Sequence, residues 1–98
     1  MNVADFVIQA LTTVRISVAM TLDGLSPEQL THRPGPESNP VGWLIWHMAR
    51  VTDRLIHMRL QDVPQIWSKD HWYEKFNMPD EPDDMGMGWS SEKVSAWQ

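Results

Sequence analysis

The sequence predicts an all-α protein, an up-down helical bundle, on the basis of three observations. Residues 2–23 and 39–60 repeat apolar side chains at spacings of three and four, which is the period of an amphipathic helix. Both segments begin with residues that favour helix starts. Except for Pro40 and Gly42 at the start of the second segment, the prolines and glycines lie outside both segments. A chain of 98 residues is large enough for one hydrophobic core, so we expect a single domain over residues 1–98.

The first helix is predicted over residues 2–23. Asn2 is a suitable N-cap, Asp5 falls in the first turn, and Gly24 is placed to end the helix. The side chains of one broad apolar stripe are Val3, Phe6, Val7, Ala10, Leu11, Val14, Val18 and Leu22.

A short helical turn is predicted over residues 26–31. Ser26 can cap it, Pro27 suits its first position, and Gln29 can complete a capping box with Ser26. Residues 31–38 contain two prolines and a glycine, which predicts a loop.

The second long helix is predicted over residues 39–60, with Asn39 as N-cap and Pro40 at its first position. This helix is apolar on two sides, which suits packing against a core and also against a second subunit or a covering loop. The side chains expected to share a face with His47 are Trp43, Leu44, Val51, Leu55 and Met58, and those expected on the opposite side are Ile45, Ala49, Thr52 and Ile56.

The segment 61–89 is predicted to be irregular but ordered. It holds three prolines and an acidic cluster at 80–84, which disfavour long regular structure, yet its aromatic residues are too numerous for a free linker. We expect it to lie over the helices, with a short helical turn near residues 69–76. Residues 90–98 begin another helix at a capping serine, Ser90. Since so short a helix is marginal alone, we expect 1–98 to be the N-terminal portion of a longer bundle, or a chain completed by a partner.

Composition narrows the classes of function. The chain has no cysteine, which removes disulfides and thiolate metal sites. Its net charge of −5 argues against binding nucleic acid. The first helix carries Asp5 and Arg15 and has neither a basic start nor a small-residue cleavage site, so we expect no signal peptide. No apolar run approaches the length of a membrane span, so we expect a cytoplasmic protein.

His47 is the leading candidate for a functional residue because it lies within the apolar part of a helix. Its ring is either satisfied by an uncharged hydrogen-bond partner, as buried histidines commonly are, or it is a metal ligand. A catalytic metal site needs about three protein ligands. His57 is about 15 Å further along the same helix and cannot share the ion; it is expected to pair with Asp53 instead. No H-x-x-x-H pattern is present, and the sequence identifies no catalytic residues.

Three neighbours of His47 are candidates for a substrate pocket. Trp43 either packs in the core or walls a pocket around His47. Arg50 and Arg54 are either solvated, or paired with acids of the segment 61–89, or they clamp a substrate carboxylate near a metal.

The order of these segments resembles a known family. The residues that carry the resemblance are Leu25-Ser26-Pro27-Glu28-Gln29-Leu30, Arg33-Pro34-Gly35 and the run from Asn39 to Asp53. They resemble the first half of a DinB-like (YfiT-like) four-helix bundle. The resemblance implies a homodimer that holds a divalent metal, nickel or zinc, with three histidines. One of them takes the place of His47, and the other two lie in an H-x-x-x-H on the last helix.

The resemblance also implies an activity, that of a metal-dependent transferase or isomerase that uses a low-molecular-weight thiol. A metal of this kind would bind the thiol as thiolate and lower its pKa. The H-x-x-x-H helix is not among these 98 residues. The alternative prediction is therefore a non-catalytic helical module that forms a homodimer through its exposed tryptophans and methionines and binds no metal.

Overall fold

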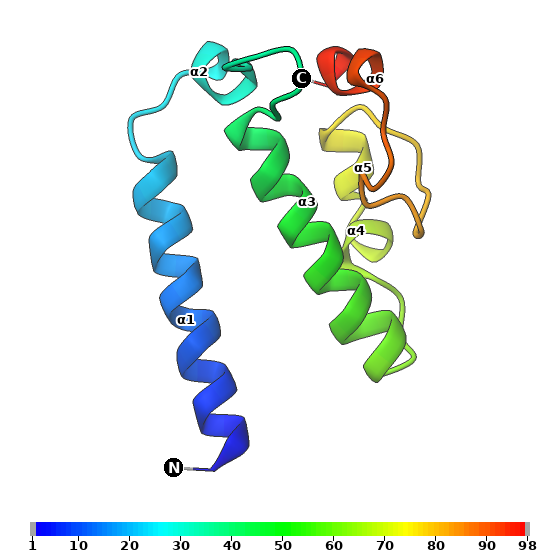
Figure 1. Cartoon of the computed structure of the whole chain (residues 1–98). Coiled ribbons are helices and arrows are strands. Elements are labelled where there is room, and N and C mark those ends of the chain that lie inside the picture. Colours follow the sequence, from blue (N-terminus) through cyan, green and yellow to red (C-terminus); the bar gives the residue numbers. More distant parts are fainter. Residues whose placement is uncertain (1, 98) are drawn as a thin grey trace.

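The computed structural model describes residues 2–97 and confirms the all-α class, since these residues contain no strand. Two long helices lie side by side, and short helices and loops cover one side of the second (Figure 1). The elements in chain order are α1 (Val3–Leu22), α2 (Pro27–Thr31), α3 (Val41–Asp53), η1 (Arg54–Leu60), α4 (Ile66–Lys69), α5 (Trp72–Lys75) and α6 (Ser91–Ala96).

The ends of α1 follow from local chemistry. The Asn2 side chain accepts a hydrogen bond from the backbone N–H of Asp5 at 2.8 Å, which confirms the predicted N-cap. At the other end Gly24 has a φ of +79°, the left-handed conformation that glycine adopts most easily after a helix.

No residue of α1 is buried, although the helix is strongly apolar. Its predicted stripe therefore remains largely open to solvent. By length and mean hydropathy, α1 is the one helix in the described residues that could cross a membrane, a property that core helices of soluble proteins share. The large exposed side chains of α1 are Val3, Phe6, Val7, Ile8, Leu11, Val14, Ile16 and Met20.

The turn α2 closes its own N-terminus with the predicted capping box. The backbone N–H of Ser26 donates to Gln29 Oε1 at 2.8 Å, and the backbone N–H of Gln29 donates to Ser26 Oγ at 3.2 Å. The following helix, α3, begins at Val41 and has Pro40 as its N-cap, so the prediction of Asn39 as N-cap was wrong. Pro40 has an extended backbone, with ψ at 150°, and its carbonyl accepts the first helical hydrogen bond from Leu44.

The helix continues to Leu60, but η1 is wound as a π-helix. Of the residues predicted to share a face with His47, Leu44 and Leu55 are 42% and 52% exposed, so this face is only partly covered. The buried residues of α3 are Trp43, Trp46 and Arg50.

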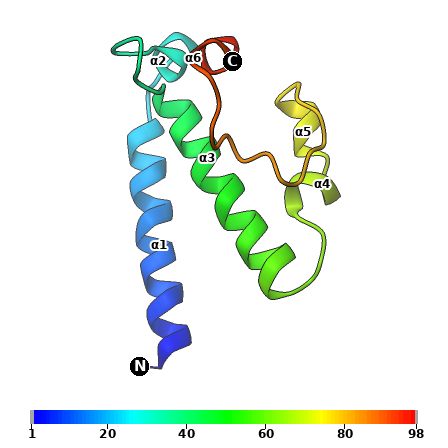
Figure 2. The ribbon, with the colours of Figure 1, turned by 45° about the vertical axis from the view of Figure 1, so that its right-hand side comes forward.

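The segment 61–89 is more regular than predicted, because it contains two short helices, α4 and α5. Asp53 caps the N-terminus of α4, although it is 13 residues away in sequence from Ile66. Its two carboxylate oxygens accept hydrogen bonds from the backbone N–H groups of Ile66 and Trp67 at 2.9 and 2.8 Å. A carboxylate is thus bound at a helix N-terminus, where the helix dipole favours negative charge. In both views α3 lies between α1 and the α4–α5 segment (Figure 2).

The core is an aromatic cluster between α3 and the segment that follows η1. Its buried members are Trp43, Trp46, Trp67 and Val94, and the partly buried residues packed against them are Tyr73, Phe76, Met78, Trp89 and Trp97. The Trp46 ring lies within 5.3–6.3 Å of the rings of Trp43, Trp67, Trp89 and Trp97, measured between centroids. Tilted and edge-on pairs at these distances stabilise a core beyond the area they bury.

Gly86 and Gly88 provide a matched test of this packing, because both have positive φ values, +91° and +75°. A Cβ at Gly86 would lie 2.6 Å from Trp43 Cζ2, whereas a Cβ at Gly88 meets nothing within 4 Å. We expect Gly88→Ala to lower the free energy of unfolding by about 1–2 kcal/mol for backbone conformation alone. Gly86→Ala should cost about 1–3 kcal/mol more because of overpacking. Urea denaturation followed by tryptophan fluorescence measures both, and equal losses would contradict the description of this contact.

Candidate functional site

Arg50 is the most buried charged residue of the site, with 2% of its surface exposed. Its Nη1 donates to Gln65 Oε1 at 2.6 Å. Its Nη2 donates to the backbone carbonyls of Glu81 and Asp84 at 3.0 and 2.9 Å. The guanidinium also lies 4.3 Å from the centre of the Trp67 ring. The side chain therefore joins α3 to three separate parts of the segment 61–89.

Burial lowers the pKa of the Arg50 guanidinium below its ordinary value, and the nearby carboxylates of Asp53, Asp84 and Asp80 oppose this change. The group stays protonated, since an arginine pKa is far above the pH of any cell. Its charge is balanced by carbonyl dipoles at hydrogen-bond distance and by carboxylates further away.

Arg54, one turn further along, is held differently. Its Nη2 lies 3.0 Å from Asp83 Oδ1, and the Asp83 side chain is largely exposed. This pair confirms the prediction that an arginine here meets the acids of the segment 61–89. The structure thus places both arginines of the predicted clamp in contacts within the chain.

These two arginines allow a stability test with a matched control. Arg50→Met keeps a long apolar stem but removes every hydrogen bond to Gln65 and the carbonyls, so we expect a loss of about 3 kcal/mol or more of unfolding free energy. Arg54→Met breaks an exposed ion pair and should cost at most about 1 kcal/mol. Chemical denaturation of the two variants checks the difference. A similar small loss in both would mean that the Arg50 contacts do not hold the segment.

His47 is half-buried on α3, and its ring is fixed on two sides. Its Nδ1 is within hydrogen-bond distance of the Met85 carbonyl oxygen. Its ring stacks on that of Trp43, with centroids 5.2 Å apart and planes 9° from parallel. Trp43 thus packs in the core and also covers one side of the imidazole. It combines the two roles that were predicted as alternatives, a core residue and a wall beside His47.

The partner of Nδ1 determines where the lone pair of the imidazole lies. A carbonyl oxygen can only accept, so Nδ1 carries the hydrogen. In the neutral ring Nε2 is then the acceptor, with a free electron pair. A backbone carbonyl on the far nitrogen is also the common arrangement for histidines that bind metals through Nε2. The His47 ring is therefore oriented and protonated so that Nε2 could act as one ligand of a metal ion.

The other histidines do not join His47. His57 Nδ1 lies 2.7 Å from Asp53 Oδ1, which confirms the predicted pair. His32 and His71 are exposed. His71 approaches Glu74 at 3.5 Å, and the two form an H-x-x-E pair that the sequence analysis overlooked. Within residues 2–97 no three His, Asp or Glu side chains are grouped so that they could hold a metal ion.

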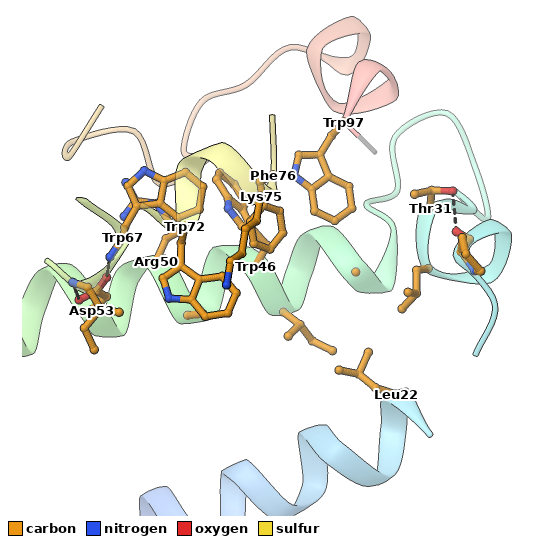
Figure 3. A pocket seen from close by; sticks show the side chains of 16 residues that line it. Leu22, Thr31, Trp46, Arg50, Asp53, Trp67, Trp72, Lys75, Phe76 and Trp97 are labelled. Atoms are coloured by element: carbon orange, nitrogen blue, oxygen red, sulfur yellow. Dashed lines mark hydrogen bonds between the residues drawn. The ribbon is translucent and has the colours of Figure 1, made fainter. Parts of the chain in front are cut away.

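A large apolar pocket of about 730 Å³ lies between α3, the turn α2, the end of α1 and the short helices α4 and α5. Ile45 and Ala49 line it, and each is two residues from His47, which turns them about 160° away from that ring. Leu22 at the end of α1 points toward α3 across the pocket, and Trp97 extends into it from beyond α6 (Figure 3). Sequence analysis missed this pocket, although the apolar residues on the second side of α3 were a signal for it.

Comparison with known proteins decides the family. The family model of the DinB superfamily matches residues 10–97, which include most of α1, the whole of α3 and η1, the aromatic core and His47. The chain belongs to the DinB superfamily. A comparison with curated proteins gives no match. The resemblance seen in residues 25–53 is therefore confirmed at the level of the superfamily, over most of the chain.

The match places His47 and the residues around it within the DinB superfamily domain. The domain has two distinct features: an imidazole fixed against the Met85 carbonyl, and an apolar pocket that α3 and the short helices α4 and α5 line together. The first suits coordination chemistry, and the second suits an apolar partner.

Proposed function

We propose that this DinB superfamily domain holds a divalent metal, nickel or zinc, through His47 Nε2, and acts as a thiol-dependent transferase or isomerase. The observation that supports the proposal best is the hydrogen bond between His47 Nδ1 and the Met85 carbonyl, which leaves Nε2 free to coordinate. The family match supports it further, because it includes this helix.

The residues around His47 would hold its imidazole in a fixed orientation for binding the metal. The Trp43 ring limits rotation of the imidazole, and Gly86 lets the segment at Met85 approach Trp43 and Trp46 closely. Arg50 secures the same segment through its bonds to the Glu81 and Asp84 carbonyls. When bound, the metal would lower the pKa of a thiol and provide a nucleophile near neutral pH.

The described residues supply only part of the ligand set of such a metal site. One imidazole meets only part of the need for about three protein ligands at a catalytic metal. The remaining ligands would have to come from residues other than 2–97 or from another chain, since the described residues provide no group of three. Arg50 and Arg54 act in this proposal through the segment 61–89, because their donors face oxygens of that segment.

Metal binding is tested by His47→Ala, with His32→Ala as the control at an exposed loop histidine. Zinc or nickel is titrated into the protein, and bound metal is counted by mass spectrometry after gel filtration. In a sample that contains the full domain with its remaining ligands, we expect about one ion per chain in the parent and in His32→Ala, and at least a roughly tenfold weaker affinity after His47→Ala. Equal metal content in all three proteins would refute the assignment of His47.

The thiol step has its own test. With cobalt in place of zinc, adding a low-molecular-weight thiol should produce a sulfur-to-metal charge-transfer band, because the thiol binds as thiolate. The chain has no cysteine, so such a band would come from the added thiol. A metal-loaded sample whose spectrum does not change with thiol would retain the metal site and exclude the thiol chemistry.

A further inference from the structure

Asp84 has a carboxylate that turns back onto its own loop. Its Oδ1 accepts a hydrogen bond from the backbone N–H of Gly86 at 3.2 Å and another from Trp89 Nε1 at 2.8 Å. Its Oδ2 lies 3.7 Å from Lys93 Nζ, and only 20% of the side chain is exposed. The neighbouring Asp83 side chain is 81% exposed, so these two adjacent carboxylates have very different surroundings.

The hydrogen bond from Gly86 to Asp84 fixes the peptide unit between Met85 and Gly86. This unit is planar and trans, so its N–H and its C=O point in opposite directions. The N–H is bound by the Asp84 carboxylate, and the C=O is within hydrogen-bond distance of His47 Nδ1. One rigid peptide unit therefore connects a carboxylate to the imidazole. The bond from a side-chain oxygen to the N–H two residues on is an Asx turn, which the short side chains of Asp and Asn form.

Contacts from two directions hold this turn against α3. The Arg50 guanidinium donates to the main-chain carbonyl of Asp84 at 2.9 Å. The Trp89 ring, whose Nε1 is bound by the carboxylate, lies 6.0 Å from the Trp43 ring between centroids. Trp43 in turn stacks on the His47 ring. The carboxylate is thus joined to the same aromatic group that covers one side of the imidazole.

We propose that Asp84 is a positioning residue for His47. Through the Met85–Gly86 peptide it keeps the imidazole hydrogen on Nδ1 and leaves the electron pair of Nε2 free. The use of this nitrogen for a metal rests on the proposed function, but the tautomer is a property of the chain without metal. When the turn is lost, the peptide can rotate and Nδ1 loses its acceptor. The ring can then carry its hydrogen on Nε2, the nitrogen that a metal would need.

The test compares three substitutions of Asp84 with Asp83→Ala as the matched control at the adjacent, exposed carboxylate. Asp84→Ala removes the acceptor. Asp84→Asn keeps an oxygen at the same distance from the backbone without the charge, so the turn can form. Asp84→Glu keeps the charge, but its carboxylate is one methylene further from the backbone and does not fit the turn. The Asn and Glu variants thus separate geometry from charge, and they decide the test if Asp84→Ala does not fold.

The tautomer is read from the nitrogen-15 chemical shifts of the two ring nitrogens of His47. The sample is the full metal-free chain at about pH 8, where an ordinary imidazole is neutral. We expect the hydrogen on Nδ1 in the parent, in Asp83→Ala and in Asp84→Asn. In Asp84→Ala and Asp84→Glu roughly half of the rings or more should carry it on Nε2, because no acceptor then selects Nδ1. His57 is the internal reference, since its Nδ1 is bonded to Asp53 and should keep its hydrogen in every folded variant.

A hydrogen on Nε2 of His47 in the parent overturns the inference, as does an unchanged tautomer in both Asp84→Ala and Asp84→Glu. A change in Asp84→Asn with none in Asp84→Glu also overturns it, because charge rather than the turn would then set the ring. If the tautomers follow the expectation and no protein of the series binds metal, the proposed function fails while the role of Asp84 stands.

Discussion

The Arg50 guanidinium makes the contacts on which the arrangement of this domain depends. A charge that is 98% removed from solvent must have partners, and here the partners are the Gln65 side chain and carbonyls spread over residues 81–84. The irregular segment is thereby held to α3, with Trp67 beneath the guanidinium. The Met85 carbonyl reaches His47 because the residues just before it are fastened in this way.

A carboxylate one turn away does a related task at shorter range. Asp53 accepts from two backbone N–H groups at the start of α4 and pairs with His57. Arg50 thus holds Gln65 and residues 81–84 of the following segment, and Asp53 holds the start of its first helix, α4. Both rely on hydrogen bonds to main-chain atoms, so the sequence of the segment can vary while its path is kept.

The parts of the fold that depend on neighbours in sequence were predictable. Asn2, the Ser26–Gln29 box and Ser90 act as caps through bonds that span three residues. His57 and Asp53 pair because they are four apart on a helix. The family could also be recognised from residues 25–53, where the order of caps, loop and aromatic residues is distinctive. His47 was predicted as the leading candidate for a functional residue. Its contact with the Met85 carbonyl agrees with one of the two alternatives given for it, an uncharged hydrogen-bond partner.

What could not be predicted depends on contacts distant in sequence. The burial of Arg50 needs carbonyls more than 30 residues away, and no helical period reveals them. The exposure of Leu44 and Leu55 on α3 could not be predicted either, because a helical period shows which residues share a face and not which of them a distant segment covers. The exposure of α1 could not be predicted from the sequence either. An apolar stripe indicates that a helix needs a packing partner, but it does not show whether the same chain provides that partner.

The π-helical turn η1 has a consequence for how the domain tolerates changes in length. A π-helix winds more residues into each turn than an α-helix, and Val63 N–H closes its end by donating to the His57 carbonyl at 2.9 Å, six residues back. Between Arg54 and Leu60 the backbone therefore accommodates more chain than a regular helix of the same length would hold. A relative that lacks one residue there could wind the stretch as an ordinary α-helix and still deliver its chain to the start of α4. Length variation among related domains should accordingly concentrate at this turn.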